Sequence, residues 1–198
     1  MISPRQIEER ELRKKRIIES ALTVFQEKGI DGATMDEIAS VAGFGKATLY
    51  YYFSSKEEVF SQIMENGWKT LWSELGETIQ EIGSPREKFV KLLNKIVEVT
   101  LTDRNLYTFI FTASQNMPSS AEGNLSWKTY QQRMYRVLQE LLDEGIALGE
   151  FPPVKSGFLM RAIGGLFHGF MFLSGGSGTL NKADIEQLIT NLLSTENS

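Results

Sequence analysis

The chain has 198 residues, a formal net charge of −4, no cysteine and one histidine, which allows one large domain or two small ones with a buried core. Disulfides, thiolate zinc sites and thiol nucleophiles are excluded, and one histidine cannot form a histidine-rich metal site. Carboxylate metal sites remain open, but we expect neither a cofactor nor a bound metal. No apolar run approaches the length of a membrane span and the charged N-terminus is unlike a secretory signal, so we expect a cytoplasmic protein.

The first predicted element is an amphipathic helix over about residues 8–28. Its apolar side chains recur at the spacing i, i+3, i+4 and i+7, at Ile18, Ala21, Leu22 and Phe25. This spacing places them on one face of a helix, where they can enter a core. Gly29 follows at the position where a left-handed glycine commonly ends a helix.

Two short helices joined by a tight turn are predicted next, from Thr34 to about residue 53. Thr34 and Glu37 have the spacing of a capping box, in which a hydroxyl and a carboxylate satisfy backbone N–H groups at the helix start. Gly43 and Gly45 supply the backbone freedom that a sharp turn between helices needs. This order of elements is typical of a helix-turn-helix that reads the major groove of DNA.

Three consecutive tyrosines close the second short helix. Successive helical residues are rotated by about 100°, so three adjacent tyrosines cannot all face the core. The predicted core face carries Leu49, Tyr52 and Phe53, and another face carries Ala47, Tyr50 and Tyr51. An amphipathic surface helix with solvated tyrosines would show the same pattern. The lysine, threonine and small alanine beside them nevertheless favour close approach to phosphates and base edges.

The remaining elements are also predicted to be helices. Ser55 with Glu58 and Ser84 with Glu87 repeat the capping-box spacing, and Asp103 is a further candidate cap. Beyond the first three helices, we expect helices ending near residues 82, 101 and 114, followed by helices at about 125–144, 154–173 and 181–193. No strand-like alternation is present, so the fold is expected to be all-α with about nine helices.

The segment from about residue 13 to residue 60 resembles the DNA-binding domain of the TetR family of bacterial transcriptional regulators. The residues that carry the resemblance are Ile17–Ala21, Phe25, Gly29–Ile30, Gly32–Thr34, Glu37–Ala39, Ala42–Gly43, Lys46–Phe53 and Ser55–Glu58. One departure is Gly45, where the family usually has serine or a similar cap. Glycine is a weaker cap, and we transfer no side-chain contact with DNA to it. The resemblance implies a helix-turn-helix domain at 8–56 and a ligand-binding and dimerisation domain at 57–198.

The outward spacing and the resemblance together predict eight contacts with double-stranded operator DNA. Lys46, Ala47, Thr48 and Tyr51 are expected to reach base edges in the major groove. Thr34, Tyr50, Tyr52 and Lys56 are expected mainly to hold phosphates.

The distribution of charge agrees with this division. Residues 1–56 contain nine basic and eight acidic residues, a balance of +1, so the remainder must carry −5 to reach the total of −4. A locally basic edge can hold phosphates while an acidic body weakens non-specific adhesion to DNA. The basic run Arg13–Arg16 would be a solvated helix start on composition alone, and its place ahead of the helix-turn-helix favours phosphate contact.

The last two predicted helices are expected to form a homodimer interface. Residues 162–173 interleave glycines with large apolar side chains, leaving more apolar faces than one layer of neighbours can bury. Core packing explains part of the pattern, and the resemblance implies a four-helix arrangement made by two copies. The expected interface residues are Gly164, Gly165, Phe167, Phe170, Met171, Leu188, Ile189 and Leu192.

A small-molecule cavity in the body is implied by the resemblance. Aromatic and methionine side chains at helical spacing are more often ordinary core, and His168 can equally be an interior histidine. The candidate lining residues are Trp68, Tyr107, Phe111, Trp127, Tyr130, Met134, Phe167, His168 and Met171. Metal sensing needs cysteine or several histidines and sugar recognition needs many buried polar groups, so we expect an apolar or aromatic effector.

The leading interpretation is a homodimeric transcriptional repressor that a small-molecule effector releases from its operator. An enzyme is one alternative, but the chain lacks cysteine and a glycine-rich phosphate loop, which leaves little for nucleophilic or nucleotide chemistry. A helical adaptor that binds protein is another. Steep salt dependence of DNA binding would distinguish the regulator from both alternatives.

Overall fold

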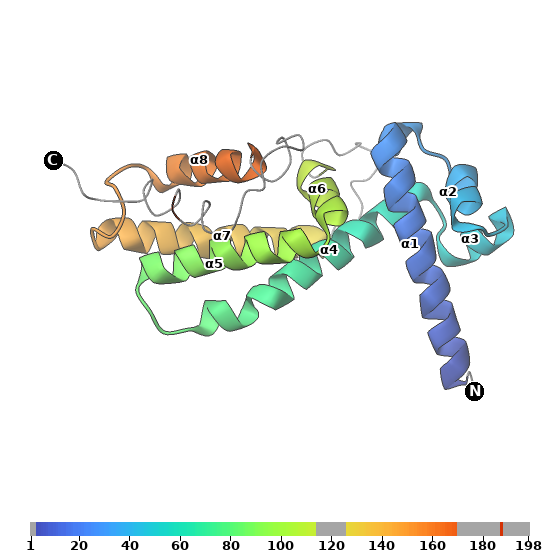
Figure 1. Ribbon diagram of the computed structural model, residues 1–198, viewed down its shortest axis with the longest axis horizontal. Helices are drawn as coiled ribbons and strands as arrows, with labels where there is room; N and C mark the ends of the chain where they lie inside the picture. Colours follow the sequence, from blue (N-terminus) through green and yellow to red (C-terminus); the bar gives the residue numbers. More distant parts are fainter. Residues whose placement is uncertain (1–2, 114–125, 170–186, 188–198) are drawn as a thin grey trace. The chain divides into compact units, whose positions relative to one another are not determined.

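The fold is all-α, as predicted. A computed structural model describes residues 3–113, 126–169 and 187, and in these ranges the chain forms eight helices (Figure 1). They are α1 (Pro4–Gly32), α2 (Met35–Ala42), α3 (Lys46–Tyr52), α4 (Lys56–Gln80), α5 (Pro85–Thr102), α6 (Arg104–Ala113), α7 (Ser126–Ala147) and α8 (Ser156–His168). The helix predicted near residues 181–193 lies outside the described residues. No helix in the described ranges is both long and apolar enough to cross a lipid bilayer.

The chain divides into two compact units. One is made of residues 1–68 and 105–127, and the other of residues 69–104 and 128–198. The first unit therefore contains the predicted head at 8–56 together with the first half of α4 and with α6. Helix α4 continues without a break from the first unit into the second.

Helix α1 begins earlier than predicted, at Pro4 instead of near residue 8. The Ser3 hydroxyl accepts a hydrogen bond from the Gln6 N–H, and the Gln6 side chain accepts one from the Ser3 N–H at 2.8 Å. This capping box was readable in the sequence, because proline at the first helical position strengthens such a start. At the other end, Gly29 has a φ of 71° and kinks the helix before a last turn.

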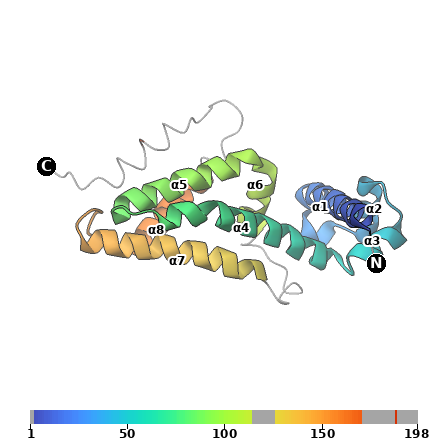
Figure 2. The same cartoon turned by 90° about the horizontal axis from the view of Figure 1, so that it is seen from below.

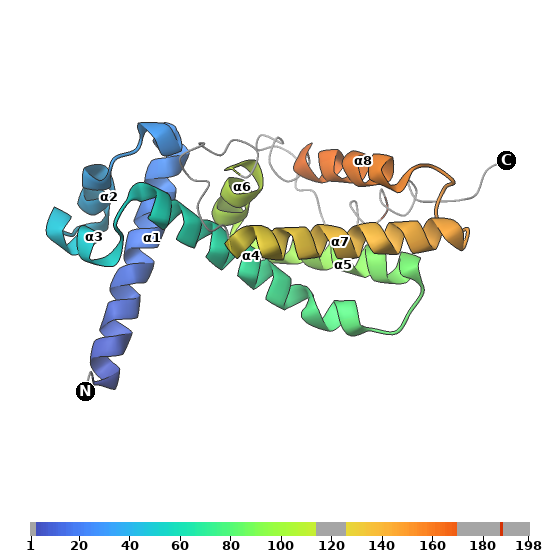
Figure 3. The ribbon, with the colours of Figure 1, turned by 180° about the vertical axis from the view of Figure 1, so that it is seen from behind.

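The core of the first unit forms where α1 packs against α2, which in turn contacts α3 (Figure 3). The buried face of α1 consists of Ile17, Ala21, Val24 and Phe25. This buried face is rotated relative to the predicted one, and Ile18 and Leu22, which were predicted to be buried, are only half-buried. Positions 17, 21, 24 and 25 also have helical spacing, so the sequence pattern alone allows either face to enter the core. On α3, Leu49 is buried and Phe53 follows it into the core, while Tyr52 is half-buried, close to the prediction.

Helix α6 packs against α1 and α4 inside the first unit. The ring of Phe60 on α4 lies edge-on to Phe25 and to Phe109 of α6, with centroids 6.4 and 5.8 Å away. Gln26 on α1 donates a hydrogen bond to the backbone carbonyl of Asn105 at 3.0 Å. A Cβ on Gly67 would lie only 2.9 Å from Ile110, so this glycine inside α4 permits the close approach of α6.

The second unit contains α5, α8, nearly all of α7 and the second half of α4 (Figure 2). Ser84 and Glu87 form the predicted capping box at the start of α5. Arg86 binds Glu150 twice, from its backbone N–H to the carboxylate and from its guanidinium to the carbonyl, both at 2.9 Å. These bonds hold the segment after α7 against the start of α5.

Candidate nucleic-acid interface and effector region

The start of α2 is held by a closed set of hydrogen bonds. The Thr34 hydroxyl accepts from the Glu37 N–H, while the Glu37 carboxylate accepts from the Thr34 N–H at 3.0 Å and from its hydroxyl at 2.9 Å. Lys28 on α1 also pairs with this carboxylate. The hydrogen bond from Lys28, followed by those from Thr34, lowers the pKa of Glu37. Thr34 thus works as a helix cap, and its contact with phosphate stays a prediction.

The turn between α2 and α3 depends on Gly43. Its φ of 69° is left-handed, and a Cβ there would lie 3.0 Å from a guanidinium nitrogen of Arg16. The guanidinium of Arg16 lies over the ring of Phe44, 5.4 Å from its centroid. Arg16 therefore braces the turn from α1. Gly45 is different, because it has ordinary extended backbone, makes no side-chain cap and has open space where a Cβ would be.

The face of α3 that was predicted to point outward is exposed. Tyr50 and Tyr51 are 46% and 69% exposed, and Lys46 and Ala47 are also exposed, with Thr48 half-buried between them and the core. The ammonium of Lys46 lies 2.8 Å from a carboxylate oxygen of Asp36, which raises the pKa of Lys46. For Lys46 to contact DNA, this exposed ion pair would have to break, or the Asp36 carboxylate would have to lie at the DNA surface together with Lys46.

Lys56 lies at the start of α4, and its ammonium is engaged within the protein. It donates hydrogen bonds to the backbone carbonyls of Asp31 at 2.9 Å and Ala33 at 3.0 Å. These carbonyls follow the kink in α1, so Lys56 ties α4 to the end of α1. A third ammonium proton is left for the predicted phosphate, which remains a prediction.

The second capping box of the head closes in a different way from the prediction. The Ser55 hydroxyl accepts from the Glu58 N–H, as expected. The Glu58 carboxylate instead accepts from the N–H and the hydroxyl of Ser54, both at 2.7 Å. These bonds lower the pKa of Glu58, and they fix the turn between α3 and α4.

The basic run Arg13–Arg16 makes several contacts within the first unit. Arg13 pairs with Glu9 at 2.5 Å, and Lys15 lies 3.8 Å from Glu19. Lys14 donates to Gln62 on α4 at 2.9 Å and lies over the ring of Phe53. The run therefore joins α1 to its neighbours, and its contact with phosphate stays a prediction. Arg10, which the sequence did not single out, lies over the ring of Tyr51 with its carbon 5.6 Å from the centroid.

The candidate effector residues are divided between the two units. Trp68, Tyr107, Phe111 and Trp127 belong to the first unit, and Tyr130, Met134, Phe167 and His168 belong to the second. Met171 lies outside the described residues. In the first unit, Trp68 is buried with its ring edge-on to Phe111 at 5.1 Å.

Each unit has a buried polar atom without a hydrogen-bond partner among the described residues. These atoms are the indole nitrogen of Trp68 in the first unit and the side-chain oxygen of Asn94 on α5 in the second. An unpaired buried polar group is unfavourable by roughly 1–3 kcal/mol, so each is a place where a ligand could bind. Asn94 was missed from the sequence, although it is a lone amide beside the buried Leu92, Leu93, Ile96 and Val97.

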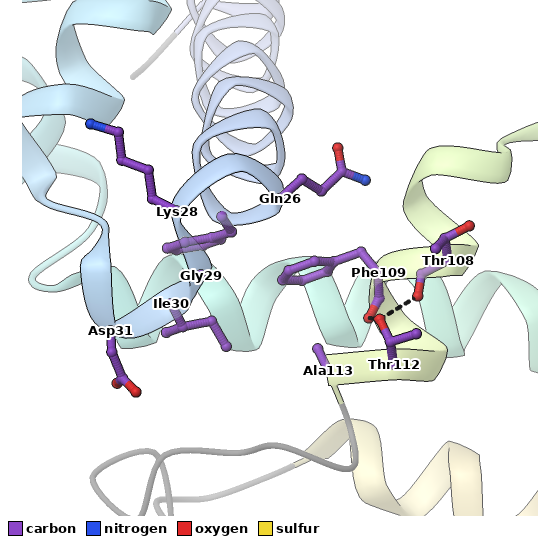
Figure 4. Close-up of a pocket in the computed structure, with 10 residues that line it drawn as sticks. Gln26, Lys28, Gly29, Ile30, Asp31, Thr108, Phe109, Thr112 and Ala113 are labelled. Atoms are coloured by element: carbon purple, nitrogen blue, oxygen red, sulfur yellow. Dashed lines mark hydrogen bonds between the residues drawn. The ribbon is translucent and has the colours of Figure 1, made fainter. Parts of the chain in front are cut away.

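A cavity of about 670 Å³ lies between the end of α1 and α6, inside the first unit (Figure 4). Its lining combines apolar and polar side chains, and the Thr112 hydroxyl donates a hydrogen bond to the backbone carbonyl of Thr108 at 2.7 Å. Figure 4 shows Lys28 and Asp31 directed away from Phe109. The volume is in the range of small-molecule sites, but none of the candidate effector residues within the described ranges lines this cavity.

Part of the predicted dimer interface is described on α8. Gly164 and Gly165 are exposed, and a Cβ on either would meet nothing within 4 Å. Phe158, which the sequence did not single out, is 60% exposed on the same helix. Phe167 is half-buried. Phe170, Met171, Leu188, Ile189 and Leu192 lie outside the described residues.

Family comparisons cover both parts of the chain. Residues 17–63 match the family model for bacterial regulatory proteins of the tetR family, and residues 82–194 match the model of the tetracyclin repressor-like C-terminal domain. The chain is 29% identical over 155 residues to the uncharacterized HTH-type transcriptional regulator YfiR of Bacillus subtilis, a match that covers 75% of this chain and 72% of YfiR.

A second relative matches in the head. Over 53 residues the chain is 45% identical to IcaR of Staphylococcus epidermidis, the HTH-type negative transcriptional regulator of the biofilm operon icaADBC. This match covers 27% of the chain and 29% of IcaR, so it concerns less than a third of either protein.

Two solved structures share the fold at 20% identity. PfmR of Thermus thermophilus, a TetR family transcriptional regulator, has a TM-score of 0.73 and matches over 92% of this chain and 100% of its own. AibR in complex with isovaleryl coenzyme A and operator DNA has a TM-score of 0.77 and matches over 91% and 98%.

Proposed function

Because the chain belongs to the tetR family of bacterial regulatory proteins, it is a helix-turn-helix DNA-binding transcriptional regulator and not an enzyme, and we propose that it is a homodimeric repressor. In this proposal it acts in the cytoplasm, and a small-molecule effector releases it from its operator. The observation that carries the proposal is the exposed face of α3, which presents Lys46, Ala47, Tyr50 and Tyr51 beyond a glycine turn that Arg16 braces. The negative regulator IcaR, similar in the head, supports repression.

The DNA contacts divide between bases and phosphates. Thr48 and Tyr51, with Lys46 and Ala47, read base edges in the major groove, and Thr34, Tyr50, Tyr52 and Lys56 hold phosphates. The exposure of α3 supports the first group. Helix-turn-helix proteins insert the second helix of the motif into the major groove, and phosphate contacts set its register.

The homodimer uses the exposed face of α8. One helix-turn-helix reads a half-site, and two-fold symmetry sets two recognition helices about 34–36 Å apart on successive major grooves. The open space beside Gly164 and Gly165 supports close approach of a second copy. Exposed Leu166 and Phe158 supply apolar surface on the same helix.

The effector is an apolar or aromatic molecule with a small number of polar groups. Buried aromatic side chains such as Trp68 and Tyr107 supply apolar surface. The unpaired indole N–H of Trp68 donates a hydrogen bond to an acceptor on the ligand. Apolar pockets with few polar anchors bind such ligands. The structural similarity to AibR, solved with isovaleryl coenzyme A and operator DNA, supports an effector that acts on DNA binding.

The effector signal reaches the head through two helices. Helix α4 runs continuously from the head into the second unit. Helix α6 follows α5 directly in the chain but packs on α1 through Phe109 and Asn105. A ligand that binds one arrangement of these helices more tightly than another shifts the population toward the first arrangement, and away from the arrangement in which the head binds the operator.

Binding of labelled duplexes, selected by the wild-type protein from a random library, tests the function. We expect affinity to fall steeply as salt rises, with dimers seen by light scattering at micromolar protein. Gly165→Glu should give monomers that bind the selected duplex weakly, while Gly76→Glu, a matched change at another open helical glycine, should leave dimers intact. A wild-type monomer that binds the duplex fully would exclude the dimer. Salt-insensitive binding would instead favour a protein adaptor.

A further inference from the structure

The N-terminal turns of α1 extend beyond the packed part of the first unit. The helix begins at Pro4, but its first buried side chain is Ile17. Between these residues every side chain is exposed except that of Lys14, which is half-buried. Figures 1 and 3 show these turns continuing past α3 toward the N-terminus. A helical segment without a buried face adds nothing to the core, so its role lies outside the core.

Local interactions form this segment in advance of any partner. The capping box of Ser3 and Gln6 closes its start, and the Glu9–Arg13 pair spans one turn at 2.5 Å. Pairs at this spacing stabilise a helix modestly. A preformed helix gives up little conformational freedom on binding, which favours a role in recognition.

The charges of this segment are sorted by face. Gln6, Arg10 and Arg13 fall within about 60° of one another around the helix, whereas Glu8 lies about 160° from Arg10 and Glu11 about 100°. Glu9 is the one acidic residue near the first group, and Arg13 neutralises it. The face of α1 directed toward α3 therefore carries a positive charge, which Arg10 supplies.

This face and the end of α3 enclose a groove of about 310 Å³. It is lined by Gln6, Glu9, Arg10, Arg13, Tyr51 and Tyr52. Arg10 lies over the ring of Tyr51, and the rings of Tyr51 and Tyr52 meet edge-on with centroids 5.2 Å apart. The guanidinium of Arg10 and the hydroxyl of Tyr52, a residue proposed above to hold a phosphate, both line this groove. Such groups are donors that DNA phosphates accept from in protein complexes.

We propose that this groove holds a phosphate of the DNA backbone outside the base pairs that α3 reads, with Arg10 as its cation. The inference rests on the proposed function, because Tyr51 belongs to the recognition helix. When α3 occupies the major groove, Tyr51 lies against the duplex, so the backbone phosphates of that duplex are the anions nearest to this groove. The N-terminal turns of α1 thus lengthen the DNA footprint of each head.

The test compares Arg10→Ala with Arg5→Ala in the full chain. Both variants lose one arginine from α1, but Arg5 is exposed, does not line the groove and lies about 140° from Arg10 around the helix. The probe is the wild-type-selected duplex, used at full length and trimmed on both sides outside the selected bases. Arg10→Ala should weaken binding to the full duplex about threefold to tenfold and lower the salt slope by about one for each head.

Arg5→Ala should bind like the wild type, and trimming should remove most of the difference that Arg10→Ala makes. Arg10→Lys should recover part of the affinity. Unchanged thermal midpoints would show that all variants are folded. Equal losses for Arg10→Ala and Arg5→Ala, an equal effect of Arg10→Ala on both duplexes, or no effect would overturn the proposal. Binding of inorganic phosphate that blocks the groove without altering DNA affinity would overturn it too. Failure of the wild type to bind any duplex would reject the proposed function instead.

Discussion

The ring of Phe25 on α1 lies nearly parallel to the ring of Phe109 on α6, with centroids 6.1 Å apart and 11° between the planes. The two residues are separated by 84 positions in the sequence. Both are buried, so this contact is part of the core of the first unit. It attaches a helix that was expected in the regulatory domain to the DNA-binding head.

Removing the Phe109 ring should therefore destabilise the head. Phe109→Ala is expected to lower the free energy of unfolding by about 3–5 kcal/mol, because the substitution loses apolar contact and leaves a cavity. Ile82→Ala is the matched control, since Ile82 is fully exposed and exposed truncations usually change stability by less than about 0.5 kcal/mol. Urea unfolding followed by circular dichroism measures both. Equal stability of the two variants would mean that α6 does not support the head.

The two glycines around the recognition turn should respond oppositely to serine. Gly45→Ser should stabilise the protein by a few tenths of a kcal/mol, because serine is the better cap and the site has room for its side chain. Gly43→Ser should destabilise it by about 1 kcal/mol or more, because the left-handed backbone and the nearby Arg16 leave no comfortable place for a Cβ. Thermal midpoints of the two variants compare them directly. A destabilised Gly45→Ser protein would contradict the cap argument.

Thr48 and Lys56 should affect DNA binding in different ways. Thr48→Ala should change base preference at one or two operator positions, as measured by selection from a random library. Lys56→Ala should weaken binding to all duplexes and lower the salt slope by about one. It should also lower stability by about 1–2 kcal/mol, since the carbonyls of Asp31 and Ala33 lose their donor. Equal losses on selected and random DNA for both variants would remove the proposed division between bases and phosphates.

The capping carboxylate of Glu37 should make a pH-dependent contribution to stability. Its pKa in the folded protein is lowered from 4.5, first by the hydrogen bond from Lys28. A lowered folded-state pKa means that the carboxylate stabilises the fold above its ordinary pKa and loses this effect as pH falls through the folded value. Glu37→Gln can keep the capping geometry but lacks the charge. The difference in thermal midpoint between wild type and Glu37→Gln should shrink from pH 7 to below pH 4, and a constant difference would contradict this account.

The sequence by itself determined the features that depend on neighbouring residues. The capping boxes at Thr34 and Ser84 form as expected, because their partners lie three positions apart. The left-handed Gly29 and Gly43 were predictable for the same reason. The outward face of α3 followed from helical rotation alone. The missed start of α1 at Ser3 was equally local and could have been recognised from its capping pattern.

Only the tertiary structure decided which distant residues meet. The contact of Arg10 with Tyr51, the two carbonyls bound by Lys56 and the packing of α6 on α1 join residues 23 or more positions apart. No periodicity encodes such pairs, because an apolar stripe specifies that a helix face is buried and leaves open which neighbour covers it. The packing of complete side chains makes that choice, and it gives α1 both its place in the core of the head and an exposed cationic end.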